Sequence, residues 1–350
     1  MNLSRVLKWS AVALALIGLP GCGSDKPKNL EKYGQFTLYG TKYDDGLRAK
    51  SKDNAADMLT QMAGEKHIVM VGLWAYNPPA ILEAVKAAKK EGDVRIVGFD
   101  EDYATLAGIK EGHIHATVVQ QPFEFGYQSV MVMVDLARDP AAALPKEAVD
   151  GVLHVPHQII RRDNIVRFKH ELEAKLASSK EKPVAVAGTP IKVLFVSNNP
   201  EEFWSIAEAG TRMAVIDLAK KGINVQVSFQ RPDKADAAIQ QRIVEDELSR
   251  GVKAVAISII DPENQVEFLN KVAARVPLIA VDNDAPKSKR RCYIGTDNYA
   301  AGREVGRLVK EVMPEGGALA IFVGQPDPLN ARQRRDGVLD ELADKDAQGK

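Results

Sequence analysis

The chain has 350 residues, of which 45% are hydrophobic and 27% are charged. This length and composition allow two domains with buried cores and exclude an intrinsically disordered chain. Lys plus Arg and Asp plus Glu both number 47, and this zero balance argues against a general nucleic-acid or anionic-membrane surface.

Residues 1–22 have the layout of a secretory signal, because two basic residues precede an apolar run over 11–17 that is too short to span a membrane. The run ends in small residues before Cys22, and this ending resembles the bacterial lipobox. The resemblance implies cleavage before Cys22 and acylation of its thiol; the alternative is an ordinary signal peptide with an incidental cysteine. Residues 23–33 are predicted to be a tether. Cys292, the remaining cysteine, has no partner for an internal disulfide.

The first half of the mature chain alternates short apolar strands with helical segments. We predict strands at 35–39, 67–72 and 94–100, helices near 79–90 and 122–140, and a final strand near the hinge within 148–164. Residues 165–191 contain few large apolar residues apart from a charged, helix-like piece, and they are predicted to form a linker.

The second half repeats this rhythm. Between 202 and 220, apolar residues recur at spacings of three and four, which is typical of one face of a helix. Strands are expected at 192–197, 224–229, 254–259, 277–282 and 318–323, with further helices near 236–250, near 263–273 and after Ala331.

Strands that are apolar on both faces and separated by helices predict an α/β fold with doubly wound parallel sheets. In such sheets, ligands bind beyond the carboxyl ends of the strands. Four polar residues fall at those ends, and they give the first indication of a site: Asp100, Asn198, Asn199 and Asp282.

Six segments carry a family resemblance. They are 97–100 (VGFD), 116–122 (ATVVQQP), 196–204, 277–283 (PLIAVDN), 294–298 (IGTDN) and 330–334 (NARQR). On these segments the chain resembles the ribose-type sugar-binding periplasmic proteins, which are relatives of the lactose-repressor core. The resemblance covers nearly all of 34–160 and 190–350, and it implies two α/β lobes that close around a small sugar.

The order of the segments departs from the family, where the part like 190–350 precedes the part like 30–160. The chain therefore resembles a circular permutant; a rearrangement of an ordinary gene is the alternative. The resemblance implies one lobe from 34–120 with 293–350 and another from 121–147 with 192–290. A three-strand hinge joins them, and 165–191 links the family's usual ends.

A sugar offers paired hydroxyl donors and acceptors and flat C–H faces, so its site needs carboxylates, amides and aromatic rings. The resemblance implies that two aromatic residues stack on the ring, that strand-end carboxylates and amides accept and donate hydrogen bonds, and that one arginine supplies a planar fork of donors. The residues concerned are Tyr76, Asn77, Asp100, Gln120, Asn199, Phe203, Trp204, Asp282, Asn283, Asn330 and Arg334.

The leading hypothesis is a substrate-binding lipoprotein, monomeric, on the periplasmic side of the cell envelope, that delivers a small sugar to the permease of an ABC importer. The alternative is a periplasmic sensor that presents the same ligand to a membrane kinase or chemoreceptor. An enzyme is disfavoured because no nucleophile–base pair and no phosphate-binding loop stand out. No cofactor, metal site or nucleic-acid partner is expected, and His113 with His115 is the one metal alternative.

Overall fold

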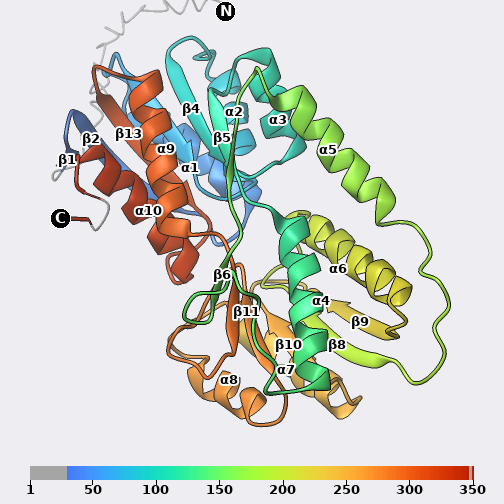
Figure 1. The fold of residues 1–350 in the computed structure, drawn as a ribbon. Coiled ribbons are helices and arrows are strands. Elements are labelled where there is room, and N and C mark those ends of the chain that lie inside the picture. The colour runs from blue at the N-terminus through green and yellow to red at the C-terminus, as the bar shows by residue number, and fades with distance from the viewer. Residues whose placement is uncertain (1–29, 347–348) are drawn as a thin grey trace, which may run out of the picture.

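The computed structural model describes residues 30–346 and 349–350, so Cys22 and the predicted signal lie outside the described residues. The described chain forms two lobes, each built on one sheet with helices on both faces (Figure 1). We call them the seven-stranded lobe and the six-stranded lobe. The predicted α/β class with parallel-dominated, doubly wound sheets is confirmed.

The seven-stranded sheet draws strands from both ends of the described chain. Its order is β1 (Glu31–Tyr33), β2 (Phe36–Tyr43), β13 (Gly317–Val323), β3 (Ile68–Gly72), β4 (Val94–Phe99), β5 (Ala116–Val119) and β7 (Gln158–Ile160). The two outermost strands run antiparallel to their neighbours, β1 to β2 and β7 to β5. The five strands between them are parallel to one another.

The six-stranded sheet is parallel throughout. Its order is β6 (Val152–His154), β12 (Cys292–Gly295), β11 (Leu278–Val281), β10 (Ala254–Ile257), β8 (Ile191–Val196) and β9 (Val225–Gln230). If the five strands β8 to β12 are numbered 1 to 5 along the chain, they lie side by side in the order 2-1-3-4-5. The parallel strands of the other sheet lie in the same order only when β13 counts as the first.

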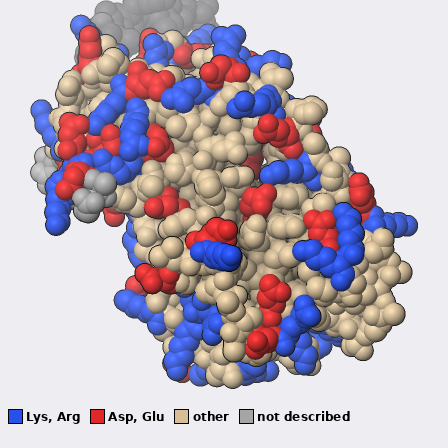
Figure 2. Space-filling view, in the orientation of Figure 1, with Lys and Arg blue, Asp and Glu red and all other residues tan. Residues whose placement is uncertain are grey.

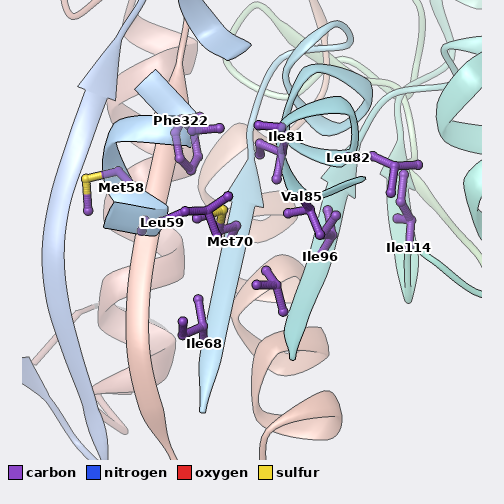
Figure 3. Close-up of a cluster of buried hydrophobic side chains, with 14 of the residues drawn as sticks. Met58, Leu59, Ile68, Met70, Ile81, Leu82, Val85, Ile96, Ile114 and Phe322 are labelled. Carbon is purple, nitrogen blue, oxygen red and sulfur yellow. The ribbon is translucent and has the colours of Figure 1, made fainter. Parts of the chain in front are cut away.

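Helices cover both faces of each sheet, because most strand residues on either face are apolar and are buried there. In the seven-stranded lobe, α1 (Arg48–Gln61), α2 (Asn77–Ala87) and α3 (Tyr103–Glu111) pack on one face, where Met58, Met70 and Ile81 belong to one buried cluster (Figure 3). Helices α9 (Asn298–Val312) and α10 (Leu329–Leu342) pack on the other.

In the six-stranded lobe, α4 (Pro122–Arg138) and α6 (Phe203–Lys220) cover one face, and α7 (Ala237–Ser249) and α8 (Val266–Ala273) cover the other. Helices α4 and α6 cross at two glycines. A Cβ on Gly126 would lie 1.9 Å from the Ala207 carbonyl oxygen, and one on Gly210 would lie 1.9 Å from that of Phe123. Backbones this close leave no room for a side chain, and the crossing fixes where α6 begins at the cleft.

Three chain segments cross between the lobes side by side. They run from β5 to α4, from β6 to β7 and from β12 to α9. Gln121 donates a hydrogen bond to the Pro156 carbonyl (2.8 Å), and the Val155 amide donates to the Gly295 carbonyl (2.8 Å), so the three segments are tied together.

Several predicted boundaries are wrong. Strand β12 belongs to the six-stranded sheet, so that lobe extends to Gly295 instead of ending at 290, and the chain crosses after it instead of before 293. The six-stranded lobe also extends beyond 147, because β6 pairs with β12, and the predicted final strand within 148–164 is two strands, β6 and β7, with a crossing at 155–157 between them. Residues 31–33, placed in the tether, pair with β2.

The predicted linker at 165–191 is largely a helix, α5 (Ile165–Ser178), and only the residues after it, up to β8, are without regular structure. Ile165 is buried in the core of the seven-stranded lobe, while Lys175 reaches Glu124 of α4 in the other lobe. This segment is therefore a fourth connection between the lobes, lying apart from the three crossings (Figure 1).

Candidate functional site

A pocket of about 410 Å³ lies between the lobes, at the carboxyl ends of strands from both sheets. It brings together every predicted ligand residue except Asn77 and Asn283. The walls are formed by Trp74, Ala75, Tyr76, Asp100, Gln120, Asn198, Asn199, Glu201, Phe203, Trp204, Asp282, Asn330 and Arg334.

Two buried carboxylates occupy matching places in the two sheets. Asp100 follows β4 and Asp282 follows β11, each being the fourth strand in the 2-1-3-4-5 order. Both have left-handed backbones, with φ of 66° and 61°, which non-glycine residues rarely adopt. Such conformations gather at ligand-binding positions, where the surrounding structure has to hold them in place.

The partners of these carboxylates are polar side chains of the same cleft. Gln120 donates to Asp100 Oδ1 (3.0 Å), and Ser258 donates to Asp282 Oδ2 (3.1 Å). Burial raises the pKa of both carboxyls, that of Asp100 to about 6, while the charge of Arg334 opposes the rise. A ligand hydroxyl that donates to either carboxylate would replace hydration lost on burial.

Arg334 on α10 is held as a flat donor between the two carboxylates. Its Nε donates to Asn298 Oδ1 (2.8 Å), its Nη1 donates to the Leu73 carbonyl (3.1 Å), and its guanidinium lies 4.1 Å from the centre of the Phe99 ring. Its Nη2 lies 3.9 Å from Asp282 Oδ1, across the two lobes. Because the other donors are fixed, Nη2 is left directed at the pocket.

Aromatic side chains form two walls of the pocket. From the six-stranded lobe, Trp204 is almost fully buried against Phe195, and its Nε1 donates to the side-chain oxygens of Asn198 and Asn199 (3.2 and 3.1 Å). Phe203 is half-buried, so of this pair it offers the more accessible ring.

From the seven-stranded lobe, Trp74 and Tyr76 meet edge to face with ring centres 6.1 Å apart. A Cβ on Gly324 would lie 2.1 Å from the Trp74 ring, so the glycine makes room for that indole. Trp74 was not among the predicted ligand residues; its position before Tyr76, beyond β3, was the available signal.

Asn77 and Asn283 support the wall instead of lining it. The Asn77 amide donates to Asp44 Oδ2 (2.8 Å), whose other oxygen accepts from the Tyr76 hydroxyl (2.5 Å). Asn283 donates to the Ile259 carbonyl and accepts from the Asn330 backbone amide (3.1 Å) in the facing lobe. Both side chains therefore hold residues that do line the pocket.

Unpartnered polar atoms concentrate in this pocket. Among the described residues, eight buried side-chain atoms have no hydrogen-bond partner, and four of them belong to its lining: Trp74 Nε1, Gln120 Oε1, Asn330 Oδ1 and Arg334 Nη2. An unpartnered buried polar atom costs about 1–3 kcal/mol, so this set of two donors and two acceptors is suited to a polyhydroxylated ligand.

The residues set aside in the sequence analysis lie elsewhere. His115 contacts Glu311 on the surface (3.1 Å), and no group of three or more His, Cys, Asp or Glu side chains within the described residues could hold a metal ion. No helix in the described part of the chain is long and apolar enough to cross a membrane. Basic and acidic side chains are mixed over the face in Figure 2, as the zero net charge suggests.

Curated relatives match a limited part of the chain. The xylose/arabinose-binding protein of Sulfolobus acidocaldarius is 25% identical over 117 residues, which is 30% of this chain and 29% of that protein. The D-ribose/D-allose-binding protein of Pseudomonas aeruginosa is 27% identical over 117 residues, 31% of this chain and 37% of that protein. The chain thus spans about a third of the length of the curated relatives that it matches.

Among solved structures, an ABC transporter solute-binding protein from Burkholderia graminis in complex with D-arabinose is 26% identical, with a TM-score of 0.42 over 46% of this chain and 55% of that one. The sequence pattern described as "Periplasmic binding protein domain" matches residues 25–141 and 192–350, which is most of the chain. This chain therefore belongs to the periplasmic binding protein domain family.

Proposed function

We propose that this protein captures a small sugar in the interlobe pocket and delivers it to the permease of an ABC importer. The observation that carries the proposal is the combination of unpartnered donors and acceptors with aromatic walls in one pocket. Hydroxyl groups satisfy both kinds of atom, and the C–H face of a sugar ring packs on an aromatic ring. The sugar-binding names of the matching relatives support the same ligand class.

Capture would depend on closure of the lobes around the ligand. Asn330 and Arg334 come from the seven-stranded lobe and approach Asp282 of the other, at 3.4 and 3.9 Å. A ligand that bridges these groups binds the closed arrangement more tightly than the open one and shifts the population toward it. The closed surface of both lobes is then the feature that a permease would recognise.

A thermal-shift screen of the protein without residues 1–22, against pentoses, hexoses, deoxysugars and polyols, tests the proposal. We expect one monosaccharide to bind with roughly micromolar affinity in subsequent titration calorimetry, and ligand at about 100 times its dissociation constant adds about 2.7 kcal/mol of stability. No response to any member of the panel would overturn the assignment.

The proposal includes a lipid anchor on the periplasmic side of the cell envelope. It rests on the lipobox-like ending at Cys22, which the described residues do not include. We expect Cys22→Ser to abolish incorporation of a fatty-acid analogue during metabolic labelling, because the thiol is the acylated group. Label that persists in this variant rules out the anchor and leaves the sugar assignment untouched.

A further inference from the structure

A second cavity of about 910 Å³, which we call the side cavity, adjoins the pocket beneath α5. The two spaces share Ala75, Tyr76, Asp100, Glu201 and Phe203 as walls, so they lie side by side. The remaining walls come from α3, from α6 and from the apolar side of α5. A ligand in the pocket therefore has room to extend a substituent into the side cavity.

The side cavity is strongly acidic. Its walls include five carboxylates, Asp100, Glu101, Asp102, Glu201 and Glu202, and no Lys, Arg or His among the described residues lines it. The nearest cation in contact with this group is Arg48, which lies 3.8 Å from Asp102 and is shared with Glu83 at 2.9 Å. A net negative cavity favours a cationic occupant and disfavours phosphate or carboxylate groups.

Glu101 supplies an independent sign of a missing partner. Only 6% of the residue is exposed, and its Oε2 has no hydrogen-bond partner. Burial and the charge of the adjacent Asp100 raise the pKa of its carboxyl. A cation placed beside Glu101 would satisfy the unpartnered oxygen and reverse this repulsion.

The carboxylates approach the side cavity from both lobes. Asp102 caps the start of α3 in the seven-stranded lobe, whereas Glu201 and Glu202 precede α6 in the six-stranded lobe. Burial and the charges of Asp102 and Glu202 raise the pKa of Glu201, while Arg48 lowers it. Like charges thus meet across the cleft, and a cation between them would favour closure.

Aromatic side chains complete the cavity. Tyr76, Tyr103 and Phe203 all belong to its walls, and Tyr103 is exposed. The face of an aromatic ring attracts ammonium groups, and carboxylates combined with rings are the usual receptor for an organic amine. Among the described residues, no three of these carboxylates lie close enough together to hold a metal ion. An organic cation therefore fits the side cavity better than a metal ion does.

We propose that the side cavity is a subsite for a protonated amine carried by the ligand, so that the natural ligand is an amino sugar or an aminoalkyl glycoside. This inference rests on the proposed sugar-binding function and narrows its ligand class. The sugar ring occupies the pocket, and the ammonium group is held by Glu101 and Glu201 among the aromatic walls.

Titration calorimetry with matched pairs of ligands tests the inference. The pairs are glucosamine with glucose, galactosamine with galactose, mannosamine with mannose, and the 2-aminoethyl with the 2-hydroxyethyl glycoside of the sugar that binds best. For at least one pair we expect the amine to bind ten times more tightly or better. The ratio of the two dissociation constants is the readout, because it cancels any effect that a substitution has on the sugar pocket.

Glu101→Gln keeps the shape of the buried side chain and removes its charge, and it should bring that ratio at least threefold closer to one. The matched control is Glu171→Gln, since Glu171 is an exposed carboxylate of α5 that does not line the side cavity. Ratios within twofold of one for every pair overturn the amine subsite while the sugar function stands, and so does an equal response of the two variants. No binding by any member of any pair overturns the sugar function itself.

Discussion

Asp100 and Asp282 share one backbone conformation, which we propose serves ligand binding. At each strand end a positive φ directs the chain sharply away from the sheet and leaves the carboxylate buried in the cleft. An L-residue is strained in this region, so the conformation persists because neighbouring backbone bonds hold it: the Asp100 amide donates to Val118 (2.8 Å) and the Asp282 amide to Ile294 (3.0 Å).

Asp100→Ala removes a carboxylate that is placed to accept two sugar hydroxyls. Two charge-assisted hydrogen bonds of about 1.5–3 kcal/mol each are lost, so we expect the dissociation constant to rise by at least ~100-fold in calorimetry. Asp150→Ala is the control, because Asp150 is an exposed aspartate with φ of 51° outside the pocket. An unchanged dissociation constant for Asp100→Ala would show that Asp100 only forms the turn after β4 and does not bind the sugar.

The raised pKa of Asp100 makes a pH dependence testable. Because its pKa in the free folded protein is about 6, the carboxyl is mostly protonated at pH 5 and mostly ionised at pH 7. Sugar hydroxyls donate to the ionised form, and the apparent dissociation constant is the intrinsic one divided by the ionised fraction. We therefore expect affinity to fall about tenfold from pH 7 to pH 5.

Asp100→Asn should abolish this dependence, since its amide does not titrate. The comparison is needed because Asp44, behind Tyr76, also has a pKa raised to about 6 by burial. If the slope persists in Asp100→Asn, another carboxyl with a raised pKa (Asp44, Asp282, Glu101 or Glu201) is responsible, and the role given to Asp100 is wrong.

Helix α5 joins the two lobes, which on the proposed mechanism separate for a ligand to enter. Its first half packs on the seven-stranded lobe through Ile165 and Phe168, and its second half reaches the other lobe through Lys175. Lys175 lies 3.0 Å from Glu124 and 5.3 Å from the centre of the Phe123 ring. Opening of the cleft therefore has to break contacts at one end of α5.

Lys175→Ala should increase the population of open molecules. The lost ion pair and cation–π contact are worth about 0.5–1 kcal/mol at a partly exposed site, which corresponds to roughly a two- to fivefold change. Single-molecule energy transfer between dyes on the two lobes measures it. The control is Lys169→Ala, on the same helix, which removes an equal charge beside the seven-stranded lobe alone. An equal increase of the open population in both variants would contradict a role of the Lys175–Glu124 contact in holding the lobes together.

The sequence pattern predicted most helices and strands. It failed where contacts with distant parts of the chain determine the structure. In α5 the apolar residues Ile165, Phe168, Leu172 and Leu176 do recur at helical spacing, but the stripe is narrow because the helix spans two lobes and covers no sheet face. The strand-end rule located Asp100 and Asp282. It could not locate Glu201 or exclude Asn77, because these depend on what lies across the cleft and on the buried partner Asp44.

At the scale of the whole molecule, the shared 2-1-3-4-5 order gives a reason to regard the chain as permuted. We propose that the ancestral order began at β8 and passed from α10 directly into β2. In support, Gly34 before β2 is packed against Leu342 at the end of α10, where an added Cβ would lie 2.3 Å from the Leu342 carbonyl oxygen. A short loop would therefore be enough to join the end of α10 to the start of β2.

A reordered chain, with residues 191–343 followed by 34–178, tests the proposal. We expect it to give a similar thermal midpoint and a dissociation constant within threefold, because every strand keeps its neighbours except β2, which loses the short edge strand β1. A second reordered chain that begins within β3, in the middle of a sheet, is the comparison and should not fold. Failure of the first chain to fold would show that the present order is required.

The position of β13 has a consequence for biosynthesis. This strand lies between β2 and β3, yet it is made about 250 residues after them, as the pairing of Ala318 with both Thr37 and Ile68 shows. On the ribosome, the six-stranded lobe can complete its sheet once β12 emerges, whereas the earlier-made half of the other lobe must wait with two unpaired apolar edges. The place of β13 between β2 and β3 thus stays empty through most of translation. A chaperone or export factor that shields those edges would act on this protein for longer than on a relative in which the three strands are consecutive.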